Sequence, residues 1–118
     1  MVVHMKKLEI IIRPEKLEEL KTVLNNYSVG GMSISSIMGC GNQKGYTYDG
    51  IKGLSLPNIN LIPKIQVNVV VADEVVSELL SSIHEEIATG KVGDGKVFVY
   101  PVEEAMRIRT GERGNKAI

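Results

Sequence analysis

The chain has 118 residues, of which 43% are hydrophobic and 24% charged, and its 14 basic and 14 acidic side chains give a formal net charge of zero. Such a chain predicts one domain with a core of modest size, and its balanced charge excludes the global field that attracts proteins to nucleic acid or to an anionic membrane. The chain has no run of 18 apolar residues and no apolar core of signal-peptide length near its start, and its one cysteine cannot form an internal disulfide. We therefore expect a cytoplasmic protein without membrane insertion. The balanced charge also predicts no nucleic-acid partner.

The first part of the chain predicts a strand, a helix and a second strand. Residues 6–14 alternate and then become continuously apolar, as a half-covered strand does. Pro14 stands where the first turn of a helix tolerates proline, and apolar residues recur at helical spacing from 15 to 27. The glycine pair in residues 29–31 ends this helix, and residues 32–40 form the second strand.

A long connection precedes a third strand and a second helix. Residues 41–59 are rich in glycine and asparagine and have no clean period. Residues 61–72 predict a strand whose alternate aliphatic side chains share one face. Residues 73–88 predict an amphipathic helix with Asp73 near its start.

The chain closes with a strand at 96–102, a short strand or extended turn at 105–110 and a polar tail. The predicted order is therefore β-α-β, a long loop and β-α-β. This order is typical of an α+β sandwich of the ferredoxin-like, split βαβ class. RNA-binding domains share this order, but aromatic residues make up 4% of this chain and its strands lack an aromatic stacking pair, which argues against that class.

The connection between the second helix and the last strand contains most of a phosphate-binding P-loop. Residues 90–96 read G-x-x-x-x-G-K, but Val97 stands where a P-loop has a serine or threonine that holds magnesium. A P-loop also runs from strand to helix, whereas this loop runs from helix to strand, and both differences exclude a P-loop. Its three glycines and two lysines can still form an anion-binding nest of backbone N–H groups, and a plain glycine-rich turn remains the alternative.

Two further segments carry residues that suit a phosphate. Arg107 and Arg109 lie two apart in RIRTGERG, so in a strand their guanidinium groups would project from one face. Residues 39–45, GCGNQKG, are another glycine-rich stretch with a lysine, at a strand end. Taken one at a time, the arginines fit a solvated strand face and residues 39–45 fit an ordinary loop root. Three such segments in one small domain favour a ligand that carries phosphates.

These segments also carry a resemblance to a known family. Residues 89–118, TGKVGDGKVFVYPVEEAMRIRTGERGNKAI, resemble the C-terminal signature of the PII nitrogen-regulatory signal-transduction proteins. The segment MKKLEIIIRPEKLEEL resembles the N-terminus of that family, and GCGNQKG resembles the start of its long T-loop. The resemblance covers residues 5–118 and is poor over residues 46–61.

The resemblance implies a ferredoxin-like homotrimer in which ATP or ADP lies in each of three clefts between subunits. The T-loop would span about residues 41–61, the B-loop 89–96 and the C-terminal loop 107–118. The B-loop and the T-loop root would hold the phosphates, while the neighbouring subunit would bring its C-terminal arginines to the phosphates and Met32 and Ser33 towards the adenine. The implied nucleotide-binding residues are Ile11, Met32, Ser33, Gly39, Cys40, Gly41, Asn42, Gln43, Val70, Thr89, Gly93, Asp94, Gly95, Lys96, Arg107 and Arg109.

The resemblance implies a second ligand, 2-oxoglutarate, which binds beside ATP and magnesium. Gln43 would be the ligand that this chain supplies to magnesium, and Lys64 would pair with the distal carboxylate of 2-oxoglutarate. Backbone amides around Lys44 and Gly45 would complete that site. ATP with magnesium would create the site and ADP would not, so the two ligands would be coupled. The T-loop would change conformation with ligand state and control a target, such as an ammonium channel, a metabolic enzyme or a transcription regulator.

The sequence departs from the family pattern in and around the T-loop. The span from Gln43 to Lys64 is longer than usual, and no tyrosine matches the one that is uridylylated in many proteobacterial members. Asn68 stands where the family usually has an acidic residue near the nucleotide.

An enzyme is not expected, because no residue stands out as a general base or water-positioning group. A slow ATPase, and a related trimer for another effector such as bicarbonate or a cyclic nucleotide, are the alternatives.

Overall fold

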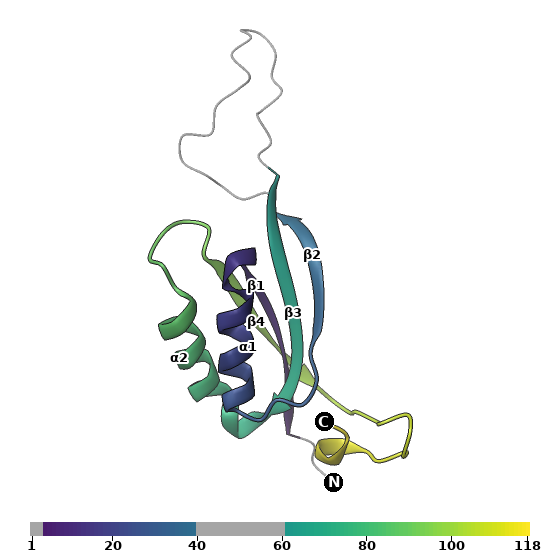
Figure 1. Ribbon diagram of the computed structural model, residues 1–118. Helices are drawn as coiled ribbons and strands as arrows, with labels where there is room; N and C mark the ends of the chain where they lie inside the picture. Colours follow the sequence, from purple (N-terminus) through teal and green to yellow (C-terminus); the bar gives the residue numbers. More distant parts are fainter. Residues whose placement is uncertain (1–3, 40–60) are drawn as a thin grey trace, which may run out of the picture.

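The computed structural model describes residues 4–39 and 61–118, and the expectations that concern residues 40–60 lie outside these ranges. The described residues form four strands and two α-helices in the predicted order (Figure 1). The elements are β1 (Met5–Ile12), α1 (Leu17–Asn26), β2 (Ser33–Gly39), β3 (Ile62–Ala72), α2 (Val76–Ile87) and β4 (Gly95–Val102), with 3-10 turns at Pro14–Lys16, Asp73–Val75 and Gly114–Ala117. Neither α-helix in these ranges has the length and the apolar run needed to cross a bilayer.

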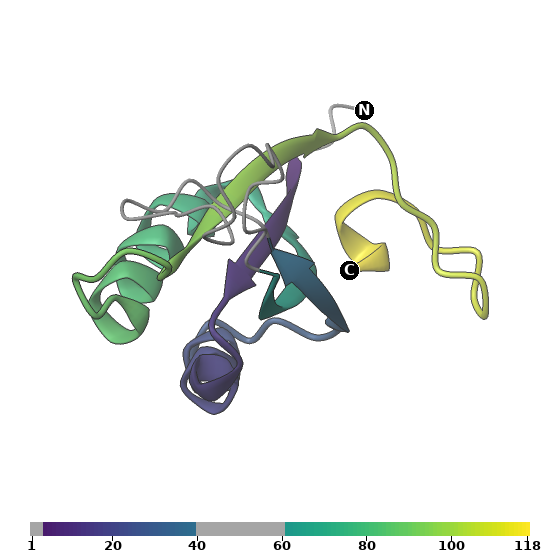
Figure 2. The same ribbon diagram turned by 90° about the horizontal axis from the view of Figure 1, so that it is seen from above.

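The four strands form one antiparallel sheet in the order β2-β3-β1-β4, with β3 and β1 in the centre. The register pairs Ile11 with Gln66 of β3 and with Lys96 of β4. Both helices pack against one face of the sheet (Figure 1 and Figure 2). This is the ferredoxin-like arrangement, so the predicted fold class is confirmed.

The core lies between the sheet and the two helices and consists of aliphatic side chains. Alternate residues of β1 and β3 point into it, because successive side chains of a strand face opposite sides of the sheet. Residues three or four apart on each helix meet them from the other side. The buried cluster comprises Leu8, Ile10, Ile12, Leu20, Val23, Leu24, Val67, Val69, Val71, Leu79, Ile83 and Ile87.

The helix boundaries depend on local chemistry that the apolar period does not capture. Helix α1 ends at Asn26, before the glycine pair that was expected to end it, because Ser28 adopts a left-handed backbone with a φ of 56°. Asp73 opens the turn before α2, as predicted; its carboxylate forms an ion pair with Lys6 at 2.8 Å and lies 3.4 Å from His4 Nδ1. The hydrogen bond from Lys6 lowers the pKa of Asp73 below its ordinary value.

The segment that follows β4 forms a turn. Arg107 N donates to the carbonyl of Glu112 at 2.8 Å, and Gly111 N donates to the carbonyl of Arg107 at 2.7 Å. Gly111 has a φ of 74°, which reverses the chain at low steric cost. For residues 105–110 the strand alternative is therefore wrong and the turn alternative is correct. Arg107 and Arg109 do not project side by side from a strand.

Candidate anion-binding site

The glycine-rich loop runs from the end of α2 to the start of β4, as the sequence predicts. It lies at the end of the sheet where β1 ends and β3 begins (Figure 1), because Ile12 pairs with both Ile65 and Gly95. Gly90, Gly93 and Gly95 have φ angles of 83°, 99° and 110°. Side chains rarely tolerate these angles, so each predicted glycine gives the loop a backbone conformation that other residues adopt only with strain.

Gly95 has a second, steric reason to be glycine. A Cβ atom at this position would lie 1.8 Å from the carbonyl oxygen of Ile11 and 2.8 Å from its carbonyl carbon. The backbones of β1 and β4 therefore approach each other more closely than a side chain would allow. The register of β1 and β4 places Lys96 directly across from Ile11, at the root of the loop, where the Lys96 side chain is exposed.

Asp94 folds back into the start of its own loop. Its Oδ2 accepts hydrogen bonds from Thr89 N at 2.8 Å and from Gly90 N at 2.9 Å, while its Oδ1 accepts one from the Thr89 hydroxyl. Arg13 Nε donates to the same Oδ1 at 3.2 Å. The hydroxyl of Thr89, followed by the backbone amides and Arg13, holds the pKa of Asp94 far below its ordinary value.

This arrangement changes the predicted anion nest. The sequence suggests that the whole loop could offer its amides to a ligand, but the amides of Thr89 and Gly90 are occupied by the carboxylate of Asp94. A carboxylate within the loop satisfies these donors, as a side-chain oxygen does at a helix N-terminus. The part of the loop left for an external anion is the second half, residues 92–96.

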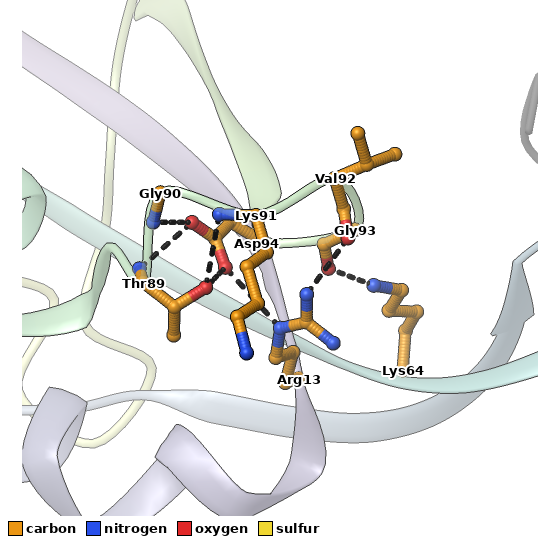
Figure 3. A network of polar contacts seen from close by, with 8 residues as sticks. All are labelled: Arg13, Lys64, Thr89, Gly90, Lys91, Val92, Gly93 and Asp94. Atoms are coloured by element: carbon orange, nitrogen blue, oxygen red, sulfur yellow. Dashed lines mark hydrogen bonds and ion pairs between the residues drawn. The ribbon is translucent and has the colours of Figure 1, made fainter. Parts of the chain in front are cut away.

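Two cations hold the carbonyl groups of that second half. Arg13 Nη2 donates to the carbonyl of Val92 at 2.8 Å, and Lys64 Nζ donates to the carbonyl of Gly93 (Figure 3). In the same view the Val92 side chain points away from both cations, and this residue is 81% exposed. Arg13 follows β1 and Lys64 belongs to β3, so the loop is held by the two central strands of the sheet.

A cavity of about 280 Å³ lies beside the loop, between α2 and the strands β1 and β4. Most of its lining side chains are aliphatic, and its polar lining residues include His84, Asp94 and Lys96. The lining residues are Ile11, Ile12, Leu80, Ile83, His84, Ile87, Ala88, Gly90, Asp94, Gly95, Lys96 and Val97. Ile11, Asp94, Gly95 and Lys96 of the implied nucleotide set are thus brought together at this end of the sheet.

A second group of the implied residues lies towards the opposite end of the sheet. Met32, Ser33 and Val70 line a shallow depression of about 520 Å³ together with Gly31, Lys7, Asn68 and Val69. Val70 pairs with Lys7, which is four residues before Ile11 on β1. At about 3.3 Å per residue, this places Val70 roughly 13 Å along the sheet from the level of Lys96. One chain therefore does not bring the whole implied set to one place.

The two arginines belong to the second end as well. The chain leaves the sheet after Val102 at the end that is remote from the glycine-rich loop (Figure 1), and Arg107 and Arg109 follow in the turn beyond it. Arg107 Nη1 lies 3.7 Å from Glu112 Oε1, and Arg109 is exposed. A carboxylate next to Arg107 keeps its guanidinium near the turn without burying it.

Glu104 fixes this arginine-bearing turn to the end of the chain. Its Oε1 accepts hydrogen bonds from Ala105 N and Gly114 N, each at 3.0 Å, and its Oε2 accepts one from Arg113 Nη2 at 3.0 Å. The backbone bond from Ala105 is the main cause that lowers the pKa of Glu104, with Arg113 and Gly114 adding to it. The turn is therefore held by charge-assisted bonds at its base.

The remaining implied residues divide into two sets. Gly39 ends β2 beside Lys64, whose Cγ would lie 3.3 Å from a Cβ at that position. Cys40, Gly41, Asn42, Gln43, Lys44 and Gly45, which include the implied magnesium ligand, lie outside the described residues. Arg13 is the loop contact that sequence reasoning missed, and an unpaired aspartate inside a glycine-rich loop is the signal that could have prompted a search for its cation.

Known proteins resemble this chain over its whole length. The model of the nitrogen regulatory protein P-II family matches residues 5–112. Nitrogen regulatory protein P-II of Haemophilus influenzae is 44% identical over 116 residues, which cover 97% of this chain and 100% of that protein. Nitrogen regulatory protein P-II 2 of Methanothermobacter thermautotrophicus is 42% identical over 117 residues, which cover 99% of this chain and 100% of that protein.

Solved structures show the same similarity in three dimensions. The structure of the GlnK–ATP complex of B. subtilis matches with a TM-score of 0.82 and 32% sequence identity, and the match covers 100% of this chain and 99% of that chain. A second structure, of B. subtilis GlnK, matches with a TM-score of 0.81 and 32% identity over 98% of this chain and 99% of that chain.

Proposed function

The chain belongs to the nitrogen regulatory protein P-II family, and we propose that it is a signalling regulator that binds ATP or ADP in clefts between three identical subunits. We propose further that it senses 2-oxoglutarate together with Mg-ATP and acts on a target protein through residues 41–61. The likeness to a GlnK solved as an ATP complex supports the nucleotide. The glycine-rich loop with Lys96 at its root supports a phosphate site at this end of the sheet.

The observation that carries the proposal is the separation of the cationic residues within one chain. Lys96 lies at one end of the sheet, and Arg107 and Arg109 lie beyond the other end. A triphosphate can meet all three side chains if a neighbouring subunit supplies the arginines. Closed cyclic symmetry satisfies this requirement in every copy, because each chain then gives its loop to one site and its arginines to the next.

The exposed face of the sheet supports assembly. Phe98 and Tyr100 of β4 pair with Glu9 and Lys7, on the face that the helices leave open, and each is 43% exposed. Burial of such aromatic surface between subunits stabilises an oligomer. We expect light scattering to give about 39 kDa, three times the chain mass of 12.9 kDa. A stable monomer that still binds ATP with micromolar affinity would contradict the shared site.

Mixing of variant chains tests the shared site directly. Lys96→Ala and Arg109→Ala should each weaken ATP binding, Arg109→Ala by roughly 1.5–3 kcal/mol, the scale of a charge-assisted hydrogen bond. In mixed trimers of these two variants, some clefts receive an intact Lys96 from one chain and intact arginines from the other, so binding should partly recover. Mixed Arg107→Ala and Arg109→Ala chains are the matched control, because every cleft then lacks one arginine. No recovery in the first mixture would place the site within one chain.

The proposed 2-oxoglutarate site depends on charge. The effector is a dianion, and beside ATP it meets further negative charge, so it requires cations close to the phosphates. Lys64 already lies against the loop, since its Nζ donates to the carbonyl of Gly93, and an ammonium group keeps further donors for a carboxylate. Magnesium would supply charge neutralisation and oxygen coordination between the two ligands, with Gln43 as the ligand from the chain.

Calorimetry separates the two ligands. Titration of 2-oxoglutarate should give binding heat with Mg-ATP and none with ADP, and Lys64→Ala should weaken 2-oxoglutarate while it leaves most of the ATP affinity. Gln43→Ala should abolish the 2-oxoglutarate response and retain ATP binding. Equal 2-oxoglutarate affinity with ATP and with ADP would refute this effector, and the ATP titration alone would still test the nucleotide site.

ATP hydrolysis faster than about 1 s⁻¹, the low end of typical enzymes, would instead favour an enzyme.

A further inference from the structure

Arg13 binds the glycine-rich loop at two points, a carboxylate and a backbone carbonyl. Among the described residues, no other cation makes both kinds of contact to this loop. Arg13 Nε binds Asp94 Oδ1 at 3.2 Å, and its Nη2 binds the carbonyl of Val92 at 2.8 Å. The side chain is 27% exposed, and that of Asp94 is 23% exposed, so both are largely shielded from water. A Cβ atom on Gly93 would lie 3.3 Å from Arg13 Nη2, so the glycine makes room for the guanidinium.

These contacts fix the directions of peptide groups. In a planar trans peptide the C=O and the following N–H point in nearly opposite directions, and the described chain has no cis peptide bond. Because the Val92 carbonyl points to Arg13, the N–H of Gly93 points away from Arg13. In the same way, the Gly93 carbonyl accepts a bond from Lys64 (Figure 3), so the N–H of Asp94 points away from Lys64.

Resting on the proposed nucleotide site, we infer that Arg13 is a positioning residue for phosphate binding. It holds Asp94 at the start of the loop and the Val92 carbonyl at the tip, and it thereby keeps the N–H of Gly93 oriented to donate to a nucleotide phosphate. A loop that is already ordered loses less conformational entropy when the ligand binds, so its affinity is higher. The planar fork of arginine makes the two bonds at once, whereas the ammonium of lysine is a single point charge.

Arg13→Lys and Arg13→Met distinguish this geometric role from a simple effect of charge. Arg13→Lys keeps the positive charge and loses the fork, whereas Arg13→Met loses both. Lys21→Met is the matched control, because Lys21 is a half-exposed cation of α1 whose ion pair is with Glu18. Urea unfolding of each variant checks that the fold persists.

The measurements are the ATP dissociation constant by calorimetry, at low and high salt, and the amide resonance of Gly93 in the nucleotide-free protein. We expect Arg13→Lys and Arg13→Met each to weaken ATP about tenfold, equivalent to about 1.4 kcal/mol. The loss should persist at high salt, because salt screens a distant charge but does not restore peptide orientation. The Gly93 resonance should shift in both variants, and Lys21→Met should match the wild type.

Two results would overturn the inference, and they differ from failure of the proposed function. Arg13→Lys that binds ATP as tightly as the wild type would show that charge alone matters. An unchanged Gly93 resonance in Arg13→Met would show that Arg13 does not orient the loop. Wild-type protein that binds no ATP would instead refute the proposed function, and the positioning role would fall with it.

Discussion

Replacement of Gly95 by alanine perturbs a close backbone approach beside the candidate site, that of β4 to β1. The new Cβ would lie 1.8 Å from the carbonyl oxygen of Ile11, whereas real Cβ atoms stay at least 3.0 Å from such atoms. The two backbones must therefore move apart by the difference, at least about 1.2 Å, which is a quarter of the usual spacing of roughly 4.8 Å between strands. The obstacle is backbone, so no side-chain rotation can relieve it.

The expected loss of stability has two parts. A separation of this size breaks about two ladder hydrogen bonds beside the Gly95–Ile12 pair, each with a net worth of about 1 kcal/mol. Alanine at a φ of 110° adds backbone strain of about 1–3 kcal/mol. We therefore expect Gly95→Ala to lower the free energy of unfolding by about 3–5 kcal/mol, a large part of the 5–15 kcal/mol typical of a domain.

Gly90→Ala is the matched control in the same loop. Gly90 has a φ of 83°, but a Cβ there would meet no atom within 4 Å, so it has backbone strain without the clash. Its expected loss is about 1–2 kcal/mol. Urea unfolding followed by circular dichroism should separate the two midpoints by about 1 M. The protomer concentrations should be equal, because the proposed assembly would add to stability. A Gly95→Ala variant no less stable than Gly90→Ala would refute the close approach of β1 and β4.

Two further predictions concern carboxylates. Because the folded-state pKa of Asp94 is lowered, the stabilising contribution of this carboxylate is complete above the ordinary value of 3.8 and is lost as pH falls through the lowered pKa. The difference in unfolding free energy between wild type and Asp94→Asn should therefore stay constant from neutral pH and narrow over roughly pH 4 to 2. A difference that widens in that range would contradict the assignment. Glu104→Ala removes one of two acceptors of Gly114 N, which also donates to the Ala105 carbonyl at 3.0 Å, so hydrogen exchange of that amide should accelerate by up to about tenfold. Exposed Glu103→Ala should leave it unchanged.

Most of the fold could be predicted from the sequence because its signals are local. The alternation along β1 and β3 and the helical spacing in α1 and α2 each report one buried face, and all four elements form where these periods predict them. The element order then leaves few topologies, of which the ferredoxin-like sheet is the one observed. Boundaries were less accurate, since single residues such as Ser28 decide them through their backbone angles.

The candidate site could be predicted in composition but not in connectivity. The glycines of the loop and Lys96 were identified from their spacing, because a loop of this kind is a local sequence feature. The commitment of the Thr89 and Gly90 amides to Asp94 was not foreseen, because the same aspartate could equally have faced solvent. Only the turn geometry of the folded loop brings the carboxylate within 2.8–2.9 Å of those two amides.

The sequence by itself determined the elements, their order and the three segments that suit phosphates, because each depends on residues close together in the chain. The tertiary structure alone decided which distant residues meet. Arg13 and Asp94 are 81 residues apart, and Lys64 and Gly93 are 29 apart. Both pairs exist because the sheet brings the end of β1, the start of β3 and the loop before β4 to the same edge. The same sheet separates Lys96 from Arg107 and Arg109, since a strand of fixed rise per residue holds its two ends apart.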